Sequence, residues 1–186
     1  MVIIGITGTL GAGKGTIVDY LVQKKNFVHF SVRFFLTEEL EKRKLDINRD
    51  NLVAVANDLR AKHSPSYIVE QLFAKAEKNK KNCVIESIRT PGEAYLLKKK
   101  GHFILIAVDA PSALRYQRIQ LRASATDHVS YHTFIENEKR EMTSDDPNKQ
   151  NLQKCIEMAD YKIINEGSID DLYKQIAVLF KKLKIT

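Results

Sequence analysis

The chain has 186 residues, 44% of them hydrophobic and 28% charged, which predicts a single domain over residues 1–186 and excludes a disordered chain. Its formal net charge is +7, but the excess lysines fall near predicted helix ends without interleaved aromatic residues, which argues against nucleic acid as a partner. No apolar run reaches the roughly 18 residues of a membrane span and no signal peptide is evident, so we predict a cytoplasmic protein that binds no membrane.

Short β-rich runs alternate with segments of helical periodicity along the chain. One helix start is a capping box, in which Thr90 is the N-cap, Pro91 the first helical residue and Glu93 the reciprocal partner. Apolar strands that alternate with helices predict an α/β fold with a parallel sheet covered on both faces, and ligands bind at the carboxyl ends of such strands. The predicted strands are residues 2–7, 27–30, 83–86, 103–110 and 161–165.

The first predicted strand runs into a glycine-rich loop with the sequence GITGTLGAGKGT, residues 5–16. Gly8, Gly13 and Lys14 fit the pattern GxxxxGK, and a helix follows from about Gly15. Glycines let backbone N–H groups curl around a phosphate, and the lysine reaches the β and γ oxygens, whereas a simple turn needs no lysine. We therefore predict a phosphate-binding P-loop made of Gly8, Thr9, Leu10, Gly11, Ala12, Gly13, Lys14, Gly15 and Thr16.

Gly15 stands where Ser or Thr usually follows the lysine of a P-loop, and the hydroxyl comes one residue later at Thr16. In this form the loop resembles that of the adenylate kinase group of nucleoside monophosphate kinases. The resemblance implies a three-layer P-loop NTPase fold with a five-stranded parallel sheet in the order 2-3-1-4-5. It also implies ATP and Mg²⁺ as cofactors, a catalytic role for Lys14 and a position beside the metal for Thr16.

The segment HFSVRFFLTEEL, residues 29–40, follows the second predicted strand as the acceptor-binding helix does in adenylate kinases. The resemblance implies acceptor-binding helices over about residues 31–80, with Ser31 and Arg33 as substrate-binding residues. The family's acceptor arginine falls at Thr37 here, so either Arg33 has that role, about one turn earlier, or the acceptor differs. Arg33 can equally be an ordinary arginine in the first turn of a helix.

The segment CVIESIR, residues 83–89, ends a predicted strand with a carboxylate and an arginine. It resembles the Asp-Gly-x-x-Arg or Asp-Gly-x-Arg segment of the same kinases, which implies that Glu86 orients hydrated Mg²⁺ and that Arg89 binds the acceptor phosphate. Glutamate replaces aspartate here. The longer side chain can reach a water-mediated metal site, and direct ligation by Glu86 stays open.

Further arginines lie in AVDAPSALRYQRIQLR, residues 107–122. Arg115, Arg118 and Arg122 are spaced i, i+3 and i+7, so they share one helix face, which is either a binding face or a solvated one. The segment resembles the helix that enters the lid of adenylate kinases. That resemblance implies that Arg118 and Arg122 contact the donor nucleotide as catalytic residues.

Residues 123–150 are polar and rich in turns, with a helix predicted over residues 131–142. We expect this segment to be the lid that closes over bound nucleotide. Arg140 is a candidate for one more phosphate contact.

The segment ADYKIINEGSIDDLYKQI near the C-terminus resembles the closing strand, the adenine-side loop and the last helix of adenylate kinases and dephospho-CoA kinases. The resemblance implies that Asn165 and Gly167 lie beside the donor base.

Together these segments predict an ATP-dependent kinase that transfers a phosphoryl group to a nucleoside or deoxynucleoside monophosphate, with small-molecule nucleotides as its partners. Such transfer requires little covalent chemistry of the protein, so catalysis rests on positioning and on the charges of Lys14, Mg²⁺ and the lid arginines. A dephospho-CoA kinase and a regulatory nucleotide-binding NTPase remain alternatives. A GTPase would carry Asn-Lys-x-Asp, and the nearest match, NKQN at residues 148–151, ends in Asn. The sequence does not predict the oligomeric state.

Overall fold

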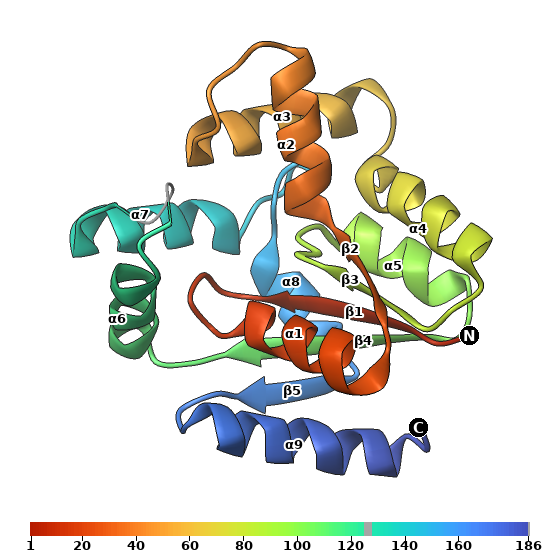
Figure 1. The fold of residues 1–186 in the computed structure, drawn as a ribbon. Coiled ribbons are helices and arrows are strands. Elements are labelled where there is room, and N and C mark those ends of the chain that lie inside the picture. Colours follow the sequence, from red (N-terminus) through yellow and green to blue (C-terminus); the bar gives the residue numbers. More distant parts are fainter. Residues whose placement is uncertain (125–127, 186) are drawn as a thin grey trace.

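Five short segments form the strands of one sheet. They are β1 (Ile3–Gly8), β2 (Val28–Ser31), β3 (Cys83–Glu86), β4 (Phe103–Asp109) and β5 (Tyr161–Ile164). The computed structural model describes residues 1–124 and 128–185, so residues 125–127 of the predicted lid lie outside the described part. All five strands run parallel in the order β2-β3-β1-β4-β5, which confirms the predicted fold (Figure 1).

Several helices begin where a short polar side chain accepts a backbone N–H of the first turn, the usual N-cap arrangement. Thr90 and Ser168 do so within capping boxes, in which Glu93 and Asp171 accept the N-cap N–H in return.

The helix predicted over residues 131–142 is present with those bounds. None of the helices in the described part of the chain is long and apolar enough to cross a membrane. The helices are α1 (Lys14–Lys25), α2 (Val32–Lys42), α3 (Arg49–Lys62), α4 (Tyr67–Asn79), α5 (Pro91–Lys99), α6 (Ser112–Arg122), α7 (Tyr131–Met142), α8 (Leu152–Glu157) and α9 (Ile169–Lys182).

β1 is the central strand, and its side chains alternate between two apolar layers. Ile4 and Ile6 pack with side chains of α1 and α9 on one face of the sheet, whereas Ile3 packs with side chains of α2 to α5 on the other. The strand ends one residue later than predicted, because its pairing with β4 continues as far as Gly8 and Val108. Both faces of the sheet are therefore covered, as a parallel sheet requires.

The carboxyl ends of the strands meet at one edge of the sheet, on the left in Figure 1, where α6 and α7 lie and above which α2 and α3 project. β1 lies between β3 and β4, so the chain leaves this edge toward opposite sides from neighbouring strands. Such a switch point is where open α/β sheets bind ligands. The fold therefore positions a site at the loop after β1.

A buried ion pair fixes the loop after β3 to α3. Arg60 of α3 donates from Nη2 to Oε1 of Glu93 at 2.8 Å, and the two side chains are 1% and 0% exposed. The other carboxylate oxygen of Glu93 accepts the backbone N–H groups of Arg89 and Thr90, at 2.8 Å and 3.1 Å. Glu93 thus holds the start of α5, the backbone at Arg89 and the end of α3 in one arrangement.

Glu93→Ala is expected to lower the free energy of unfolding by about 3–5 kcal/mol, because it leaves the Arg60 guanidinium buried without its counter-charge. The matched control is Asp171→Ala, which removes the corresponding acid from the exposed capping box of α9 and should cost far less. Urea unfolding of both variants measures the difference. Equal losses in the two variants would show that the Arg60–Glu93 pair stabilises the fold no more than an ordinary helix cap.

Candidate functional site

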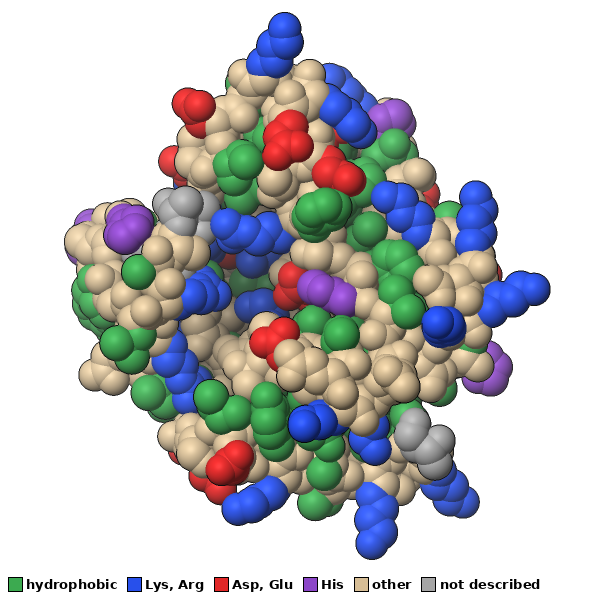
Figure 2. All heavy atoms as spheres, in the orientation of Figure 1, with side chains coloured by type: hydrophobic (Ala, Val, Ile, Leu, Met, Phe, Trp, Pro, Cys, Tyr) green, Lys and Arg blue, Asp and Glu red, His purple; other side chains and the backbone are tan. Residues whose placement is uncertain are grey.

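The carboxyl edge of the sheet opens into a cavity of about 710 Å³. Lysine and arginine side chains gather around a hollow on the face of the molecule that Figure 2 shows. The P-loop, α6 and the loop before α9 form one side of the cavity, here called the P-loop side, and α2, α3 and the loop after β3 form the α2–α3 side. The charged residues of the lining are Lys14, Asp19, Arg33, Arg49, Arg60, Glu86, Arg89, Arg118, Arg122 and Glu141.

The backbone of the P-loop requires glycine on both sides of the loop. Gly8 has φ +135°, and a Cβ there would lie 2.0 Å from the carbonyl oxygen of Val108. Gly13 has φ +101°, and a Cβ there would lie 2.3 Å from Nδ2 of Asn165. α1 begins at the next residue, Lys14, and no side chain caps it. Its first backbone N–H groups can therefore bind an anion in the cavity.

Lys14 lies half-buried at the start of α1 and points back over the loop. Its Nζ donates to the carbonyl oxygens of Gly8 and Thr9, at 3.0 Å and 2.7 Å. Burial and the positive charge of Arg89 lower the pKa of Lys14 to about 7. An anion bound in the loop would favour the charged form of this amine and would raise its pKa.

Glu86 ends β3 and faces the same cavity. It accepts a hydrogen bond from Ser31 Oγ at 2.9 Å, and His29 Nε2 lies 3.7 Å from the same Oε1. Burial works against ionisation of Glu86, but the hydrogen bonds of His29 and Ser31 and the charge of Lys14 outweigh it, so its pKa lies below the usual range. An ionised carboxylate and the hydroxyl of Thr16, which lines the same cavity, are oxygen donors of the kind that Mg²⁺ prefers.

The predicted donor-side residues of α6 and of the loop after β5 come together on the P-loop side. Arg118 donates from Nη1 to the carbonyl oxygen of Asn165 at 3.0 Å and from Nη2 to that of Gly167 at 3.4 Å. The side chain of Asn165 donates to the carbonyl oxygen of Ala12 at 2.9 Å. Arg122 also lines the cavity. Asn165 therefore ties the loop before α9 to the P-loop beneath these arginines.

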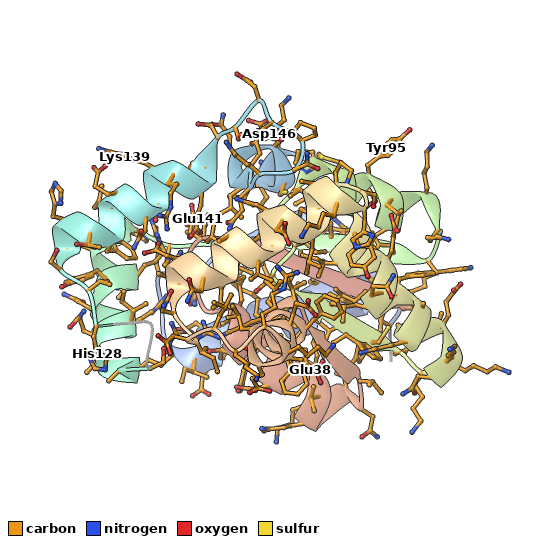
Figure 3. All side chains as sticks on the ribbon, turned by 90° about the horizontal axis from the view of Figure 1, so that it is seen from above. Glu38, Tyr95, His128, Lys139, Glu141 and Asp146 are labelled. Carbon is orange, nitrogen blue, oxygen red and sulfur yellow. The ribbon has the colours of Figure 1, made fainter. Side chains whose placement is uncertain are left out.

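Glu141 of α7 bridges two arginines of the α2–α3 side. Its carboxylate accepts from Arg49 Nη2 at 2.5 Å and from Arg89 Nη1 at 2.6 Å, and Arg89 also donates to Gln150 at 2.9 Å. Figure 3 shows Glu141 directed from α7 toward α3, whereas Lys139 of the same helix points away from it. Burial opposes ionisation of Glu141, but the charges of Arg89 and Arg49 outweigh it and hold its pKa below the usual range.

Arg49, Glu141 and Gln150 are site residues that the sequence analysis did not predict. Arg49 is the first residue of α3 and Glu141 lies at the end of α7, far apart in the chain. Neither stands in a motif, and the one signal available was that the helix predicted over residues 131–142 ends beside Glu141. The pairing depends on how the helices pack.

Three of the predicted P-loop residues shape the loop and do not belong to the described lining of the cavity. Thr9 is buried and donates from Oγ1 to Asp109 at 2.6 Å. Gly8 and Ala12 contribute the carbonyl oxygens that Lys14 and Asn165 bind. The other predicted members, Leu10, Gly11, Gly13, Lys14, Gly15 and Thr16, line the cavity.

The residues predicted from the segment after β2 lie at a second, smaller hollow of about 410 Å³. Ser31 caps α2, where its Oγ accepts the backbone N–H of Phe34 at 3.1 Å, and it lines this hollow together with Thr37. Arg33 lines both the hollow and the main cavity. Arg33, and not Thr37, is thus the position on α2 that brings a cation to the main cavity.

Two arginines of the predicted binding segments face elsewhere. Arg140 is exposed, donates to Asp50 at 3.0 Å and lies outside the described cavity lining. Arg115 is buried and pairs with Glu138 of α7, although its spacing on α6 matches that of the cavity-lining arginines. The charge of Arg115 joins α6 to α7, so the face that Arg115, Arg118 and Arg122 share is only partly a binding face.

Solved structures with the same fold include kinases. The crystal structure of TT1252 from Thermus thermophilus superposes with a TM-score of 0.62 at 19% identity, covering 98% of this chain and 97% of that one. Shikimate kinase from Acinetobacter baumannii, solved with shikimate, gives a TM-score of 0.54 at 16% identity, covering 100% and 96%. These neighbours show that the chain shares its fold with them, and the fold places a P-loop at the end of β1.

Sequence comparison gives the family. Residues 4–144 match the family described as AAA domain. The UPF0200 protein of Methanococcus vannielii is 33% identical, covering 98% of this chain and 97% of that protein, and a UPF0200 protein of Methanococcus maripaludis is 31% identical, covering 98% of each. The chain therefore belongs to the AAA domain family and to the UPF0200 proteins. The descriptions of these relatives state no activity, and they do not single out the nucleoside monophosphate kinases.

Glu141→Gln is expected to loosen α7, because Arg49 and Arg89 then face each other without a shared negative charge. We expect amide hydrogen exchange over residues 131–142 to be at least roughly tenfold faster, which corresponds to about 1.4 kcal/mol. The control is Glu136→Gln on the same helix, whose partner Lys139 is exposed. If both variants exchanged at the wild-type rate, Glu141 would not be what holds α7 against α3.

Proposed function

We propose that this protein is an ATP-dependent phosphotransferase whose acceptor is a nucleoside or deoxynucleoside monophosphate. The observation that carries the proposal is that one cavity holds two separate groups of cations. Lys14, Arg118 and Arg122 belong to the P-loop side, and Arg49 and Arg89 belong to the α2–α3 side. A nucleotide that is only bound or hydrolysed needs the first group, whereas transfer to a second anionic molecule uses both.

Each side has a distinct task in this proposal. The N–H groups at the start of α1 and Lys14 bind the donor phosphates, and Arg118 and Arg122 neutralise charge that develops during transfer. Asn165 and Gly167 lie beside the donor base.

The α2–α3 side binds the acceptor phosphate through Arg33, Arg49 and Arg89, and Ser31 contributes from the neighbouring hollow, where its hydroxyl also holds Glu86. The Nε atom of Arg49 is buried and has no hydrogen-bond partner among the described residues, so it is available to an acceptor oxygen. Arg140 would join these groups only if residues 123–150 close as a lid over the cavity.

The donor set at the end of β3 fits a magnesium ion. Glu86 is ionised and faces the cavity that Thr16 also lines. In this proposal Thr16 and Glu86 hold Mg²⁺ directly or through water, and the ion when bound neutralises charge on the β and γ phosphates. The residues of the chain then keep donor and acceptor aligned and keep water out.

One observation favours a second candidate, a kinase whose acceptor is a hydroxyl group, such as a dephospho-CoA kinase. A hydroxyl must lose its proton during transfer, and Glu86 is an ionised carboxylate within the cavity that could accept it. A monophosphate acceptor is already ionised and needs no such base. The arginines of the α2–α3 side favour the monophosphate, because a hydroxyl alone requires no cation.

ADP release separates these functions. We expect slow release with ATP and Mg²⁺ alone and at least roughly tenfold faster release when a monophosphate acceptor is added, because the acceptor oxygen is then aligned with the γ-phosphorus. The panel contains ribo- and deoxyribonucleoside monophosphates and dephospho-CoA. Stimulation by dephospho-CoA alone would establish the hydroxyl acceptor, and unstimulated hydrolysis would establish a regulatory NTPase. Lys14→Ala should reduce turnover at least about a hundredfold, whereas Lys24→Ala at the other end of α1 should not.

ATP binding is expected to take up a proton at Lys14. In the free protein its pKa is about 7, so at pH 8 the amine is mostly neutral, and a bound phosphate raises the pKa and recharges it. At pH 8 roughly 0.9 proton should be taken up per ATP, and affinity should fall by up to about tenfold per pH unit above 7. Calorimetry of Mg²⁺-free ATP in buffers of different ionisation enthalpy measures the uptake, and Lys14→Gln should abolish it. Uptake that persists in Lys14→Gln would assign the proton to another group.

A further inference from the structure

One face of α3 lines the α2–α3 side of the cavity and carries an arginine at each end. Arg49, Leu52, Val53, Ala56 and Arg60 all belong to the lining, and their spacing puts them on one side of the helix. We call this set the α3 stripe. Its two arginines are separated by about 16 Å along the helix axis at 1.5 Å per residue. The stripe is therefore cationic at both ends and apolar between them.

The inner end of the α3 stripe holds a buried donor that the protein itself leaves unused. Arg60 is 1% exposed and donates from Nε and Nη2 to Glu93 Oε1, at 3.1 Å and 2.8 Å. Its third nitrogen, Nη1, is buried and has no hydrogen-bond partner in the described part of the chain. A buried N–H without a partner is unfavourable, and Arg60 lines the cavity. An occupant of the cavity can remove this penalty.

The chemistry of that occupant follows from the guanidinium. Arginine has donors only, so Nη1 can bind an oxygen or nitrogen acceptor and is incompatible with an opposing N–H group. Glu93 already neutralises the charge of Arg60, so a neutral acceptor suffices. Leu52, Val53 and Ala56 offer an apolar wall for a flat ring beside it. Arg49, at the other end of the stripe, pairs with Glu141 among the groups proposed to bind the acceptor phosphate.

We propose that Arg60 determines acceptor specificity by donating from Nη1 to an exocyclic carbonyl oxygen of the acceptor base. This inference rests on the proposed function. Bases with a carbonyl at the purine 6-position or the pyrimidine 4-position are selected over bases with an amino group there, because the amino group would set two donors against each other. Arg60 thus joins α3 to α5 through Glu93 and reads the base through its remaining nitrogen.

Two matched pairs of acceptors test this edge of the base. IMP and AMP differ at the purine 6-position, and UMP and CMP differ at the pyrimidine 4-position, in each case by carbonyl against amino, and the adjacent ring nitrogen carries a proton in the carbonyl member and none in the amino member. With ATP and Mg²⁺ at saturation, we expect kcat/KM of the wild-type protein to be at least roughly tenfold higher for the carbonyl member of a pair, since a site built to pair a polar group discriminates strongly. This comparison requires no variant.

The variant Arg60→Gln would leave Glu93 buried and unpaired, so the test uses Arg60→Gln with Glu93→Gln. Glutamine can both donate and accept, so the ratio of kcat/KM between the members of a pair should fall to near one, while KM for ATP stays unchanged. The matched control is Glu93→Gln alone, which keeps the Arg60 donor and should keep the carbonyl preference. A purely structural role of Arg60 would lower kcat/KM for all four acceptors equally and leave the ratios unchanged.

The outcomes distinguish this inference from the function on which it rests. Turnover of all four monophosphates with no carbonyl preference, or a preference that survives in the double variant, would reject the assignment of Arg60 and keep the proposed function. Turnover of none of them would reject the proposed function, and the reading of a base by Arg60 with it. A carbonyl preference that disappears in the double variant and persists in Glu93→Gln would establish the assignment.

Discussion

Buried positive charge is the constraint on which this cavity depends. Guanidinium groups taken out of water are costly unless carboxylates pair with them. Here Arg60 is paired with Glu93 of α5, and Arg49 and Arg89 share Glu141 of α7. Glu93 lies on α5 and Glu141 lies on α7, so the ion pairs also help to fix where these two helices pack. Because Arg49 and Arg89 share a single carboxylate, these three side chains together keep a net positive charge, which can attract an anion.

Much of the fold follows from local sequence. The strands are short apolar runs, the helix starts are marked by side chains such as Thr90 and Ser168, and the glycines before Lys14 predict the turn into α1. Arg118 and Asn165, both expected beside the donor nucleotide, lie in contact with each other, because β4 and β5 are adjacent in the sheet. The segments that follow these strands, with Arg118 on α6 and Asn165 just after β5, therefore meet at one edge.

The rest depends on packing between distant segments. Arg140 and Glu141 are neighbours in sequence, so their side chains point about 100° apart on α7. Since Glu141 turns inward to Arg49 and Arg89, Arg140 faces outward to Asp50. The sequence marks an arginine and an acid near the end of a helix, but it does not reveal which of them the helix turns inward.

The pairing of Arg60 was equally impossible to predict from the sequence. Its partner, Glu93, is recognisable in the sequence as a member of a capping box, and the capping box is present. That local role accounts for only one of the carboxylate oxygens, because the other binds a helix that is distant in the chain. A side chain with one evident local function can thus hide a second, long-range one.

Because β1 lies between β3 and β4, the two sides of the cavity are formed by different segments of the chain. The P-loop side of the cavity is lined by the loop after β1, α6 and the loop before α9, and the other side is lined by α2, α3 and the loop after β3. Few residues of the P-loop side are adjacent in sequence to residues of the α2–α3 side. Substitutions on the α2–α3 side can therefore change which molecule fits there without altering the glycine-rich turn after β1. Related proteins with the same turn can thus differ in the molecules that they accept.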